Sequence, residues 1–335
     1  MARRSGAATI AEVARHARVS PATVSRVMNG NFLGEPAIAE RVRASATELS
    51  YAPNHLARSL ALGETRTIAF VVPDLANPTF QTVLSGLSKT AARDGYRVLV
   101  ADSAESPADE PLLATEIRRR CDSIVLCAPR MPEDDLVALA QSLNPLVLIN
   151  RTTPRISAPS LSIDYRTGIQ NLAQHLYSLG HRRLAYLQGP AESVSNAHRI
   201  RGLAEFEGFV KDATVEVLPG GVSSDEGYAR ASDVIRSGAT AILAYNDLVA
   251  VGLMNGLAEL GVSVPADVSV TGFDDIPFAR YTAPALTTAS VPHEELGVQA
   301  WSRLRALIRG ERPSHDVVFQ PRLELRGSTA PVPAG

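Results

Sequence analysis

The hydrophobic positions of this chain follow two different patterns, one before and one after about residue 65. In the first stretch, apolar residues recur every three or four positions, which is the spacing of one face of an α-helix. From Thr67 onward, short apolar runs alternate with helical patterns. Near-continuous apolar strands separated by crossover helices predict parallel sheets that are covered on both faces.

Two short helices are predicted between residues 9 and 30. Thr9 and Glu12 have the spacing of a capping box, which satisfies two free N–H groups at the start of the first helix. Ser20 and Pro21 predict the start of the second helix, because serine caps well and proline at the first position loses no hydrogen bond. Gly30 can end that helix in the left-handed conformation.

The second predicted helix has one face to pack and one face to expose. The packing face comprises Val24, Val27 and Met28, and the exposed face comprises Ala22, Arg26 and Asn29. A short helix with a free N-terminal turn suits the major groove of DNA, where Arg26 can bond guanine and Ala22 can contact a thymine methyl group. The hydroxyls that can donate to phosphate are Ser20, Thr23 and Ser25. The ordinary alternative is a pair of amphipathic helices from any small bundle.

A third helix and a short linker segment follow. Pro36 opens the helix, whose apolar residues are Ile38, Val42 and Leu49. The segment from His55 to Leu60 is too short to form a stable isolated helix, so it needs DNA or a second subunit as a partner. An exposed leucine such as Leu60 can wedge between base pairs from the minor groove.

The remaining chain predicts two similar α/β lobes. In the first, strands are expected at 67–72, 97–101, 123–127 and 146–149, with helices at 80–94, 109–119 and 133–143. In the second, strands are expected at 184–188, 215–218, 240–245 and 268–273. The predicted fold is therefore an all-α helix-turn-helix headpiece followed by two doubly wound parallel-sheet lobes, which separate around residues 150–165 and enclose a cleft.

Polar residues follow five of the predicted strands. They are Asn77, Asn150-Arg151, Ser195 with Arg199, Asn246-Asp247 and Asp274-Asp275. Ligands bind outside the carboxyl ends of such strands, so these residues can converge on one site. Each taken alone can instead be a turn residue or a helix cap, and we expect that role for Asp247 and Asp275. An arginine, carboxylates and amides beside the apolar ring of Phe80 suit a polyhydroxylated small molecule.

Composition and charge narrow the possible functions. The 335 residues are 45% hydrophobic and carry a net charge of −2. Residues 1–62 hold eight arginines and four glutamates, a net charge of +4, so the remaining residues carry −6. A basic first part on an acidic body restricts phosphate attraction to one end. No apolar run is long enough to span a membrane and no signal peptide is recognisable, so a cytoplasmic location is expected.

The sequence gives little support for catalysis. We find none of the common nucleotide-binding, nucleophile-elbow or zinc-protease motifs, and Cys121 and Cys127 flank an apolar run typical of buried thiols. No catalytic residue, metal site or cofactor is expected. Two alternatives to a DNA-binding regulator are a nucleotide-dependent enzyme on an α/β scaffold and a free sugar-binding protein for transport, for which the signal peptide is lacking.

Residues 9–60 resemble the DNA-binding headpiece of the lac repressor/galactose repressor family. The run from Val19 to Val27 is nearly identical to its helix-turn-helix core, and the runs from Tyr51 to Asn54 and from Ala57 to Leu60 resemble its hinge. Arg18 stands where many members have glycine. The resemblance implies minor-groove contacts from the hinge, and the full set of DNA-contact candidates is Thr9, Ser20, Pro21, Ala22, Thr23, Ser25, Arg26, Asn29, Asn54, Ala57 and Leu60.

The body resembles the sugar-binding core of the same family, which is similar to periplasmic sugar-binding proteins. The matching runs are 72–78, 245–247, 272–275 and 284–288. The implied effector contacts are Asn77, Phe80, Arg151, Ser195, Arg199, Asn246 and Asp274. The chain departs from the family pattern at Thr79 and Val222, where aromatic residues are common, at Val291, where glutamine is common, and at the nearby His293.

The resemblance implies a ligand-responsive transcription regulator, most simply a repressor, that binds a pseudopalindromic operator in double-stranded DNA as a homodimer. The implied organisation is a DNA-binding domain at 1–50, a hinge at 51–63, an effector-binding and dimerisation domain at 64–328 and a tail at 329–335. The tail has no heptads that would form a tetramerising coiled coil. A cytoplasmic protein that associates with the nucleoid when bound to DNA is expected.

Overall fold

The computed structural model describes residues 8–51, 64–313 and 316–332. The chain divides into two compact units, residues 1–65 and residues 66–335, and each is described by itself. We call the described residues 8–51 the headpiece. The predicted hinge contacts Asn54, Ala57 and Leu60 lie outside the described residues.

The headpiece is a three-helix unit of α1 (Ile10–His16), α2 (Pro21–Met28) and α3 (Pro36–Glu48). The predicted capping box is present, with the Thr9 side chain accepting from Glu12 N–H and the Glu12 carboxylate accepting from Thr9 N–H. Ser20 caps α2 as predicted, accepting from Thr23 N–H at 3.1 Å. The core is built from Val13, Ala14, Ala17, Val24, Val27, Ala39, Val42 and Ala46. On α3 the buried face is therefore Ala39, Val42 and Ala46 rather than Ile38.

The turn between α1 and α2 contains a residue in the left-handed conformation that is not a glycine. Arg18 has a φ of +55°, a conformation that costs a residue with a Cβ about 1–2 kcal/mol. Arg18→Gly is expected to stabilise the headpiece by about 0.5–1 kcal/mol, because part of the gain is offset by the greater freedom of glycine in the unfolded chain. Hydrogen exchange of α1 and α2 amides in the full-length protein measures this stability. Arg15→Gly, inside α1, is the control and should destabilise the headpiece; protection lowered equally by both variants would contradict the prediction.

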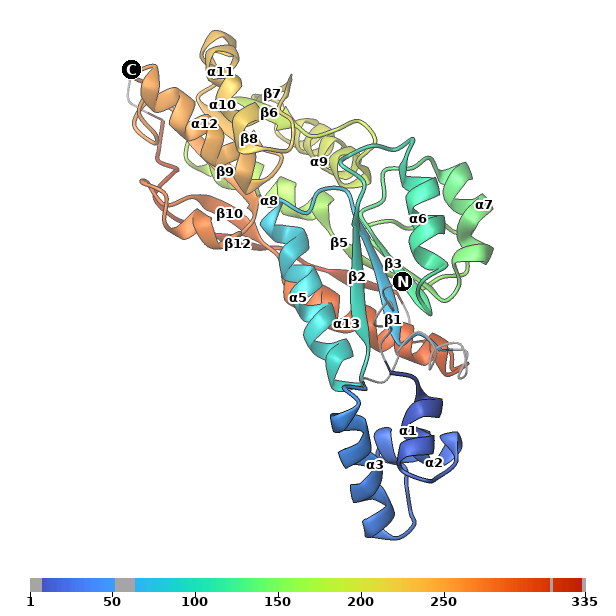
Figure 1. The fold of residues 1–335 in the computed structure, drawn as a ribbon. Coiled ribbons are helices and arrows are strands. Elements are labelled where there is room, and N and C mark those ends of the chain that lie inside the picture. The colour runs from blue at the N-terminus through green and yellow to red at the C-terminus, as the bar shows by residue number, and fades with distance from the viewer. Residues whose placement is uncertain (1–7, 52–63, 314–315, 333–335) are drawn as a thin grey trace, which may run out of the picture. The chain divides into compact units, whose positions relative to one another are not determined.

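The first lobe is a six-stranded sheet in the order β2-β1-β3-β4-β5-β11. Its strands are β1 (Thr67–Val72), β2 (Arg97–Asp102), β3 (Ser123–Cys127), β4 (Leu146–Ile149), β5 (Ser160–Ile163) and β11 (Val317–Phe319). Helices α5 (Pro78–Arg93) and α13 (His293–Ile308) cover one face, and α6 (Glu110–Arg118) and α7 (Glu133–Leu143) cover the other (Figure 1).

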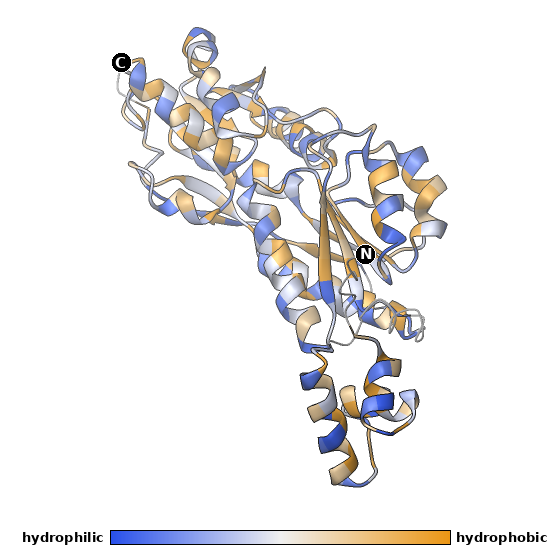
Figure 2. Cartoon of the chain, in the orientation of Figure 1, coloured by the Kyte–Doolittle hydropathy of each residue, from blue (hydrophilic) through white to orange (hydrophobic). Residues whose placement is uncertain are grey.

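The alternation of side chains along the strands explains this layering. On β1, Ile68 and Phe70 belong to the apolar cluster under α5 and α13, whereas Ala69 and Val71 belong to the cluster under α6 and α7. Successive residues of a strand point to opposite faces, so a strand that is buried on both sides must be apolar throughout. Figure 2 shows the resulting hydrophobic strands at the centre of the lobe. The strands predicted at 67–72, 123–127 and 146–149 are confirmed with their bounds.

Helices α5 and α13 pack with almost no space between their backbones. A Cβ atom on Gly297 would lie 2.1 Å from the carbonyl oxygen of Val83 and 2.5 Å from the Leu87 nitrogen. Gly86 on α5 has the same constraint against the carbonyl oxygen of Glu294. The crossing therefore depends on the absence of a side chain at these two positions.

The second lobe repeats the architecture with the strand order β7-β6-β8-β9-β10-β12. Its strands are β6 (Arg183–Gln188), β7 (Thr214–Pro219), β8 (Ala241–Ala244), β9 (Ser269–Asp274), β10 (Thr287–Ser290) and β12 (Arg322–Glu324). Its helices are α8 (Tyr165–Ser178), α9 (Val194–Phe209), α10 (Ser224–Ala229), α11 (Ala231–Ser237), α12 (Asp247–Glu259) and the 3₁₀-helix η1 (Pro277–Arg280). The short strand β12 pairs antiparallel with β10, which departs from the all-parallel prediction.

Each lobe is assembled from two separate parts of the chain. The chain passes from β5 to α8 at Asp164, returns from β10 to α13 at residues 291–292, and passes from β11 to β12 at residues 320–321. Asp164 N–H donates to the Phe319 carbonyl oxygen at 2.9 Å, which joins two of these crossings. Because all connections are short, the lobes can move relative to each other chiefly by rotation about the crossings. The tail residues Thr329 and Ala330 bond to the second lobe through His175 and Ser269.

Candidate functional site

The exposed face of α2 presents the residues that the sequence assigned to DNA. Ala22 and Arg26 are exposed, and Arg26 Nε donates to the Ala22 carbonyl oxygen at 3.3 Å. Asn29 Nδ2 donates to Ser25 Oγ at 3.3 Å, and the hydroxyls of Ser20 and Thr23 are 2.9 Å apart. These hydrogen bonds all lie within α2 and its two caps. Pro21 is exposed at the same end, and Thr9 caps α1.

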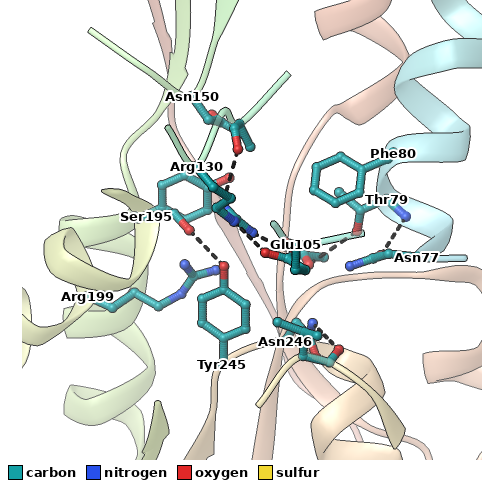
Figure 3. Close-up of a pocket in the computed structure, with 14 residues that line it drawn as sticks. Asn77, Thr79, Phe80, Glu105, Arg130, Asn150, Ser195, Arg199, Tyr245 and Asn246 are labelled. Atoms are coloured by element: carbon teal, nitrogen blue, oxygen red, sulfur yellow. Dashed lines mark hydrogen bonds and ion pairs between the residues drawn. The ribbon is translucent and has the colours of Figure 1, made fainter. Parts of the chain in front are cut away.

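A small polar cavity lies between the two lobes of the second unit, at the carboxyl ends of their strands (Figure 3). All but one of the predicted effector contacts line it. The lining residues are Asn77, Thr79, Phe80, Glu105, Ala128, Arg130, Asn150, Tyr165, Ser195, Arg199, Val222, Tyr245, Asn246 and Asp274. Its volume of about 30 Å³ accommodates one or two water molecules. The lobes are therefore in a closed arrangement that must open before a sugar-sized molecule enters.

Arg151 is the predicted contact that does not reach this cavity. Asn150 has a φ of +56° and turns the chain at the end of β4, so Asn150 lines the cavity in its place. Arg151 is buried elsewhere, and its carbonyl oxygen accepts from Ser160 Oγ at 3.0 Å. The placement of Arg151 was wrong because one left-handed residue changes which neighbour faces the cleft.

Arg199 is a buried cation held by aromatic rings. Its guanidinium carbon lies 4.3 Å from the Tyr165 ring centroid, 4.7 Å from that of Tyr245 and 4.1 Å from that of Phe273. Within the described part of the chain, its Nε and Nη1 atoms have no hydrogen-bond partner. Because unpaired buried donors are costly, these two N–H groups are free to bond an acceptor in the cavity.

Asp274 places a carboxyl group against the same cavity. Its Oδ2 accepts from the Thr79 hydroxyl at 3.2 Å, a bond that joins the two lobes. Burial raises the pKa of Asp274 to about 7, despite the lowering effects of the Arg199 charge and the Thr79 hydrogen bond. At physiological pH the neutral and charged forms of this carboxyl group are therefore both populated.

An ion pair in the cavity wall was not anticipated from the sequence. Arg130 Nε and Nη2 donate to the two carboxylate oxygens of Glu105 at 2.6 and 2.9 Å. The buried Glu110 carboxylate accepts from the N–H groups of Arg130 and Met131, which fixes the loop after β3. Glu105 and Arg130 each come three positions after the end of a strand, β2 and β3 respectively. A search for polar residues in the loops after strands could have found them, but both lie beyond the first residues of their loops.

Hydroxyl groups form a second polar wall. Ser195 Oγ lies 3.1 Å from the Tyr245 hydroxyl, and Ser193 Oγ lies 2.9 Å from each of them. Tyr245 and Tyr165 were not predicted to face the cavity, because each reads as an ordinary apolar residue at a strand or helix end. The linked hydroxyls can reorient to donate to or accept from a ligand.

The asparagines of the site also have structural duties. Asn77 Oδ1 caps α5, accepting from Thr79 N–H at 2.9 Å, and Asn246 Oδ1 caps α12, accepting from Val249 N–H at 2.9 Å. Asp247 accepts from Thr288 Oγ1 and Ile276 N–H, and Asp275 pairs with Arg326. The expectation that Asp247 and Asp275 serve the structure is confirmed, whereas Asn77 and Asn246 both cap a helix and line the cavity.

Backbone strain is concentrated in the cavity wall. Glu105, Ala128, Asn150 and Asp274 all have positive φ values, +56°, +50°, +56° and +111°. Such conformations are uncommon for residues other than glycine and cluster at ligand sites. Four of them around one cavity make this wall a candidate ligand-binding surface.

Two family descriptions match the chain. Residues 9–54 match the bacterial regulatory proteins of the lacI family, and residues 173–329 match a periplasmic binding protein-like domain. The combination defines a bacterial regulator with a headpiece and a ligand-binding-protein-like body.

Individual relatives extend the match over the chain. The HTH-type transcriptional repressor CytR of Escherichia coli K12 is 30% identical over 334 residues, which cover 98% of both chains. The lac repressor dimer bound to operator and the anti-inducer ONPF has a TM-score of 0.85 and 26% identity, covering 97% of this chain and 100% of that one. A LacI family regulator from Enterococcus faecium with bound ribose has a TM-score of 0.71 and 28% identity, covering 79% and 99%.

This chain belongs to the lacI family of bacterial regulatory proteins. The predicted family and fold are confirmed, and so is the expectation that the chain is a transcription regulator rather than an enzyme, because its relatives are regulators. In the described ranges, no helix is long and apolar enough to cross a membrane. Cys121 and Cys127 are both buried and free, as expected.

Proposed function

We propose that this protein is a repressor that binds a two-fold symmetric operator as a homodimer and responds to a neutral, polyhydroxylated effector held between its lobes. The closed polar cavity carries this proposal. The cavity wall combines the guanidinium of Arg199, which has unpaired donors, the carboxyl group of Asp274, whose pKa is about 7, and a set of hydrogen-bonded hydroxyls. The cytoplasm, with association to the nucleoid, is the proposed location.

The proposed DNA contacts follow from the exposed face of α2. One such helix reads only a few base pairs, so useful affinity needs two headpieces on half-sites about 10 base pairs apart, or a multiple of that. The hinge residues Asn54, Ala57 and Leu60 are proposed, from sequence alone, to contact the minor groove at the centre of the operator. The proposed domains are a DNA-binding domain at 1–50, a hinge at 51–63, an effector-binding and dimerisation domain at 64–328 and a tail at 329–335.

Arg26→Ala is expected to weaken binding to the preferred operator by about 1–3 kcal/mol and to relax the choice of base at one pair in each half-site. The operator is first selected from random-sequence DNA with the wild-type protein, and gel-shift titrations against single-base variants then measure the loss. Arg43→Ala, exposed on α3, is the control. An equal loss on every sequence would show that Arg26 contacts only phosphate.

The effector chemistry follows from the donors and acceptors that the cavity offers. Arg199 presents donors, Asp274 and Glu105 present acceptors, and the Ser195–Tyr245 pair can do either. Vicinal hydroxyls satisfy such a mixed set, and Phe80 offers an apolar face for a sugar ring. The E. faecium relative contains ribose, which supports a carbohydrate-like effector. Effector binding would alter the rotation between the lobes and thereby the spacing of the two hinges in the dimer. The effector can shift the equilibrium between the two lobe arrangements only by the difference between its affinities for them.

Arg199→Met is expected to weaken effector binding about 10–100-fold while leaving operator binding unchanged, because two charge-assisted hydrogen bonds are lost. A thermal-shift screen of pentoses, hexoses, disaccharides and nucleosides finds the stabilising compound, and gel shifts with it measure the response. Arg201→Met, exposed on the same helix, is the matched control. A normal titration by Arg199→Met would remove this residue from the effector site.

The regulator proposal as a whole has a simple test. The wild-type protein should prefer a two-fold symmetric site over random fragments at moderate salt. A protein that shows no such preference, with or without the compounds of the screen, is not an operator-binding repressor.

A further inference from the structure

Three side chains from three elements meet behind the effector cavity. Thr79 lies at the start of α5 in the first lobe, Asp274 ends β9 in the second lobe, and His293 begins α13 on the return to the first lobe. Asp274 Oδ2 accepts from the Thr79 hydroxyl at 3.2 Å, while Asp274 Oδ1 lies 3.7 Å from His293 Nε2. Each oxygen of the carboxyl group therefore faces a different partner.

His293 is an unusual neighbour for a buried carboxyl group. Its side chain is 6% exposed, and among the described residues neither ring nitrogen has a hydrogen-bond partner. Most buried polar atoms are paired, so an imidazole with two unpaired nitrogens calls for an explanation. A core position with only a packing role would be filled as well by a phenyl ring.

We propose that His293 is the proton acceptor of Asp274, so that the two side chains share one proton and the carboxyl group can ionise within the closed cavity without adding net charge. Before the transfer the proton is on Asp274, because the pKa of Asp274 lies above that of His293. When it moves, the Asp274 Oδ1–H bond breaks and a His293 Nε2–H bond forms. A neutral pair becomes a carboxylate and an imidazolium, and the total charge stays the same.

The electrostatic surroundings favour the proton on Asp274 before transfer. Burial raises the pKa of Asp274 to about 7 and lowers that of His293 to about 4, although the Asp274 main chain and the Asp275 charge raise the latter. The other titratable or charged groups that act on the pair are Arg199 on α9, Tyr165 on α8, Asp247 on α12 and the adjacent Asp275. Of these, only Arg199 is a cation, and it favours the ionised carboxyl group.

A second cavity gives the pair a route for proton exchange with solvent. It has a volume of about 260 Å³, and its wall includes Thr79, Asp275 and His293. Thr79 lines both cavities, so the three side chains form the partition between them. The pair can therefore equilibrate with solvent on the side away from the effector.

The consequence for the site rests on the proposed function. An effector hydroxyl that donates to Asp274 binds the carboxylate better than the neutral acid. His293 supplies that carboxylate by taking the proton, and it remains as the opposite charge behind it. His293 is thus a positioning residue that acts on the effector through Asp274.

The experiment titrates the protein without DNA or effector, so its result does not depend on the proposed function. NMR of the aspartate carboxyl carbons and the histidine rings, between pH 5 and 9, reports both groups, and Asp274→Asn and His293→Phe identify their signals. Wild-type His293 should stay neutral at pH 6 and change its ring signals as Asp274 titrates near pH 7. In Asp274→Asn this step should disappear.

Two further variants separate proton acceptance from packing. His293→Phe should lower the midpoint of Asp274 by about one pH unit, a tenfold change in proton affinity, because the pair loses the imidazole that shares and stabilises its proton. His293→Gln should do the same because an amide cannot take the proton. His175→Asn, at a half-buried histidine that bonds Thr329, should leave the midpoint unchanged. The proposal is overturned if His293 signals ignore Asp274→Asn, or if glutamine restores the wild-type midpoint.

Discussion

Asp274→Asn is expected to make the effector-free protein more stable while it removes the effector response. Burial raises the pKa of Asp274 from 3.8 to about 7, and each unit corresponds to about 1.36 kcal/mol of preference for the neutral form. The charged carboxyl group therefore costs the folded protein up to about 4 kcal/mol at pH 8. The favourable effects of Arg199 and Thr79 are already included in this difference, so a neutral side chain of the same shape should remove most of the cost.

The pH dependence gives this prediction a definite sign. A carboxyl group whose pKa is raised by folding destabilises the protein as pH rises from the unfolded value near 4 to the folded value near 7. Wild-type stability should fall over this window relative to Asp274→Asn, and the two curves should converge near pH 4. Urea unfolding at several pH values measures the difference. Asp275→Asn is the control, because Asp275 is paired with Arg326 and its replacement should destabilise the protein. An Asp274→Asn protein less stable than wild type at pH 8 would refute the assigned cost.

Gly297→Ala is expected to destabilise the first lobe by at least about 3 kcal/mol, at the upper end of the cost of overpacking. The added Cβ would lie 2.1 Å from the Val83 carbonyl oxygen and 2.5 Å from the Leu87 nitrogen. Both atoms belong to the backbone of α5, so a side-chain rotation cannot relieve the collision. The two helices would have to separate, which exposes apolar surface along their length.

Thermal and urea unfolding measure this loss, and the matched control is Gly208→Ala. Gly208 is an exposed glycine of helix α9 with open space where its Cβ would be. Alanine there should be neutral or stabilise the protein by up to about 1 kcal/mol, because alanine favours helix. Asn77 caps α5 and Phe80 lies in its first turn, so Gly297→Ala should weaken effector binding as well. Equal stability of the two alanine variants would contradict the close crossing.

The headpiece was predictable from the sequence because its signals are local. The Thr9–Glu12 capping box, the Ser20–Pro21 helix start and the left-handed Gly30 each depend on residues a few positions apart. The same holds for the strands with continuous apolar runs. Strands β5 and β10, with the sequences SLSI and TTAS, lack such a run and were not predicted.

The effector cavity was predictable only in part. Residues directly after a strand, such as Asn77, Asn246 and Asp274, could be assigned because parallel strands bring their carboxyl ends together. Glu105 and Arg130 were missed because their place in the wall depends on loop conformations, including a left-handed residue at 105. Arg151 was misplaced for the same reason. Such backbone angles are set by tertiary contacts that no local pattern encodes.

The assignment of α13 and β11 to the first lobe has a consequence for how the protein is made. A ribosome adds about 5–20 residues per second, so the three headpiece helices can fold on the order of tens of seconds before residues 317–324 provide the last strand of each sheet. For most of its synthesis, the growing polypeptide therefore carries a folded headpiece but not the two complete lobes that form the effector cavity. A stop codon anywhere between the end of α3 and the start of β11 therefore leaves both lobes incomplete rather than one.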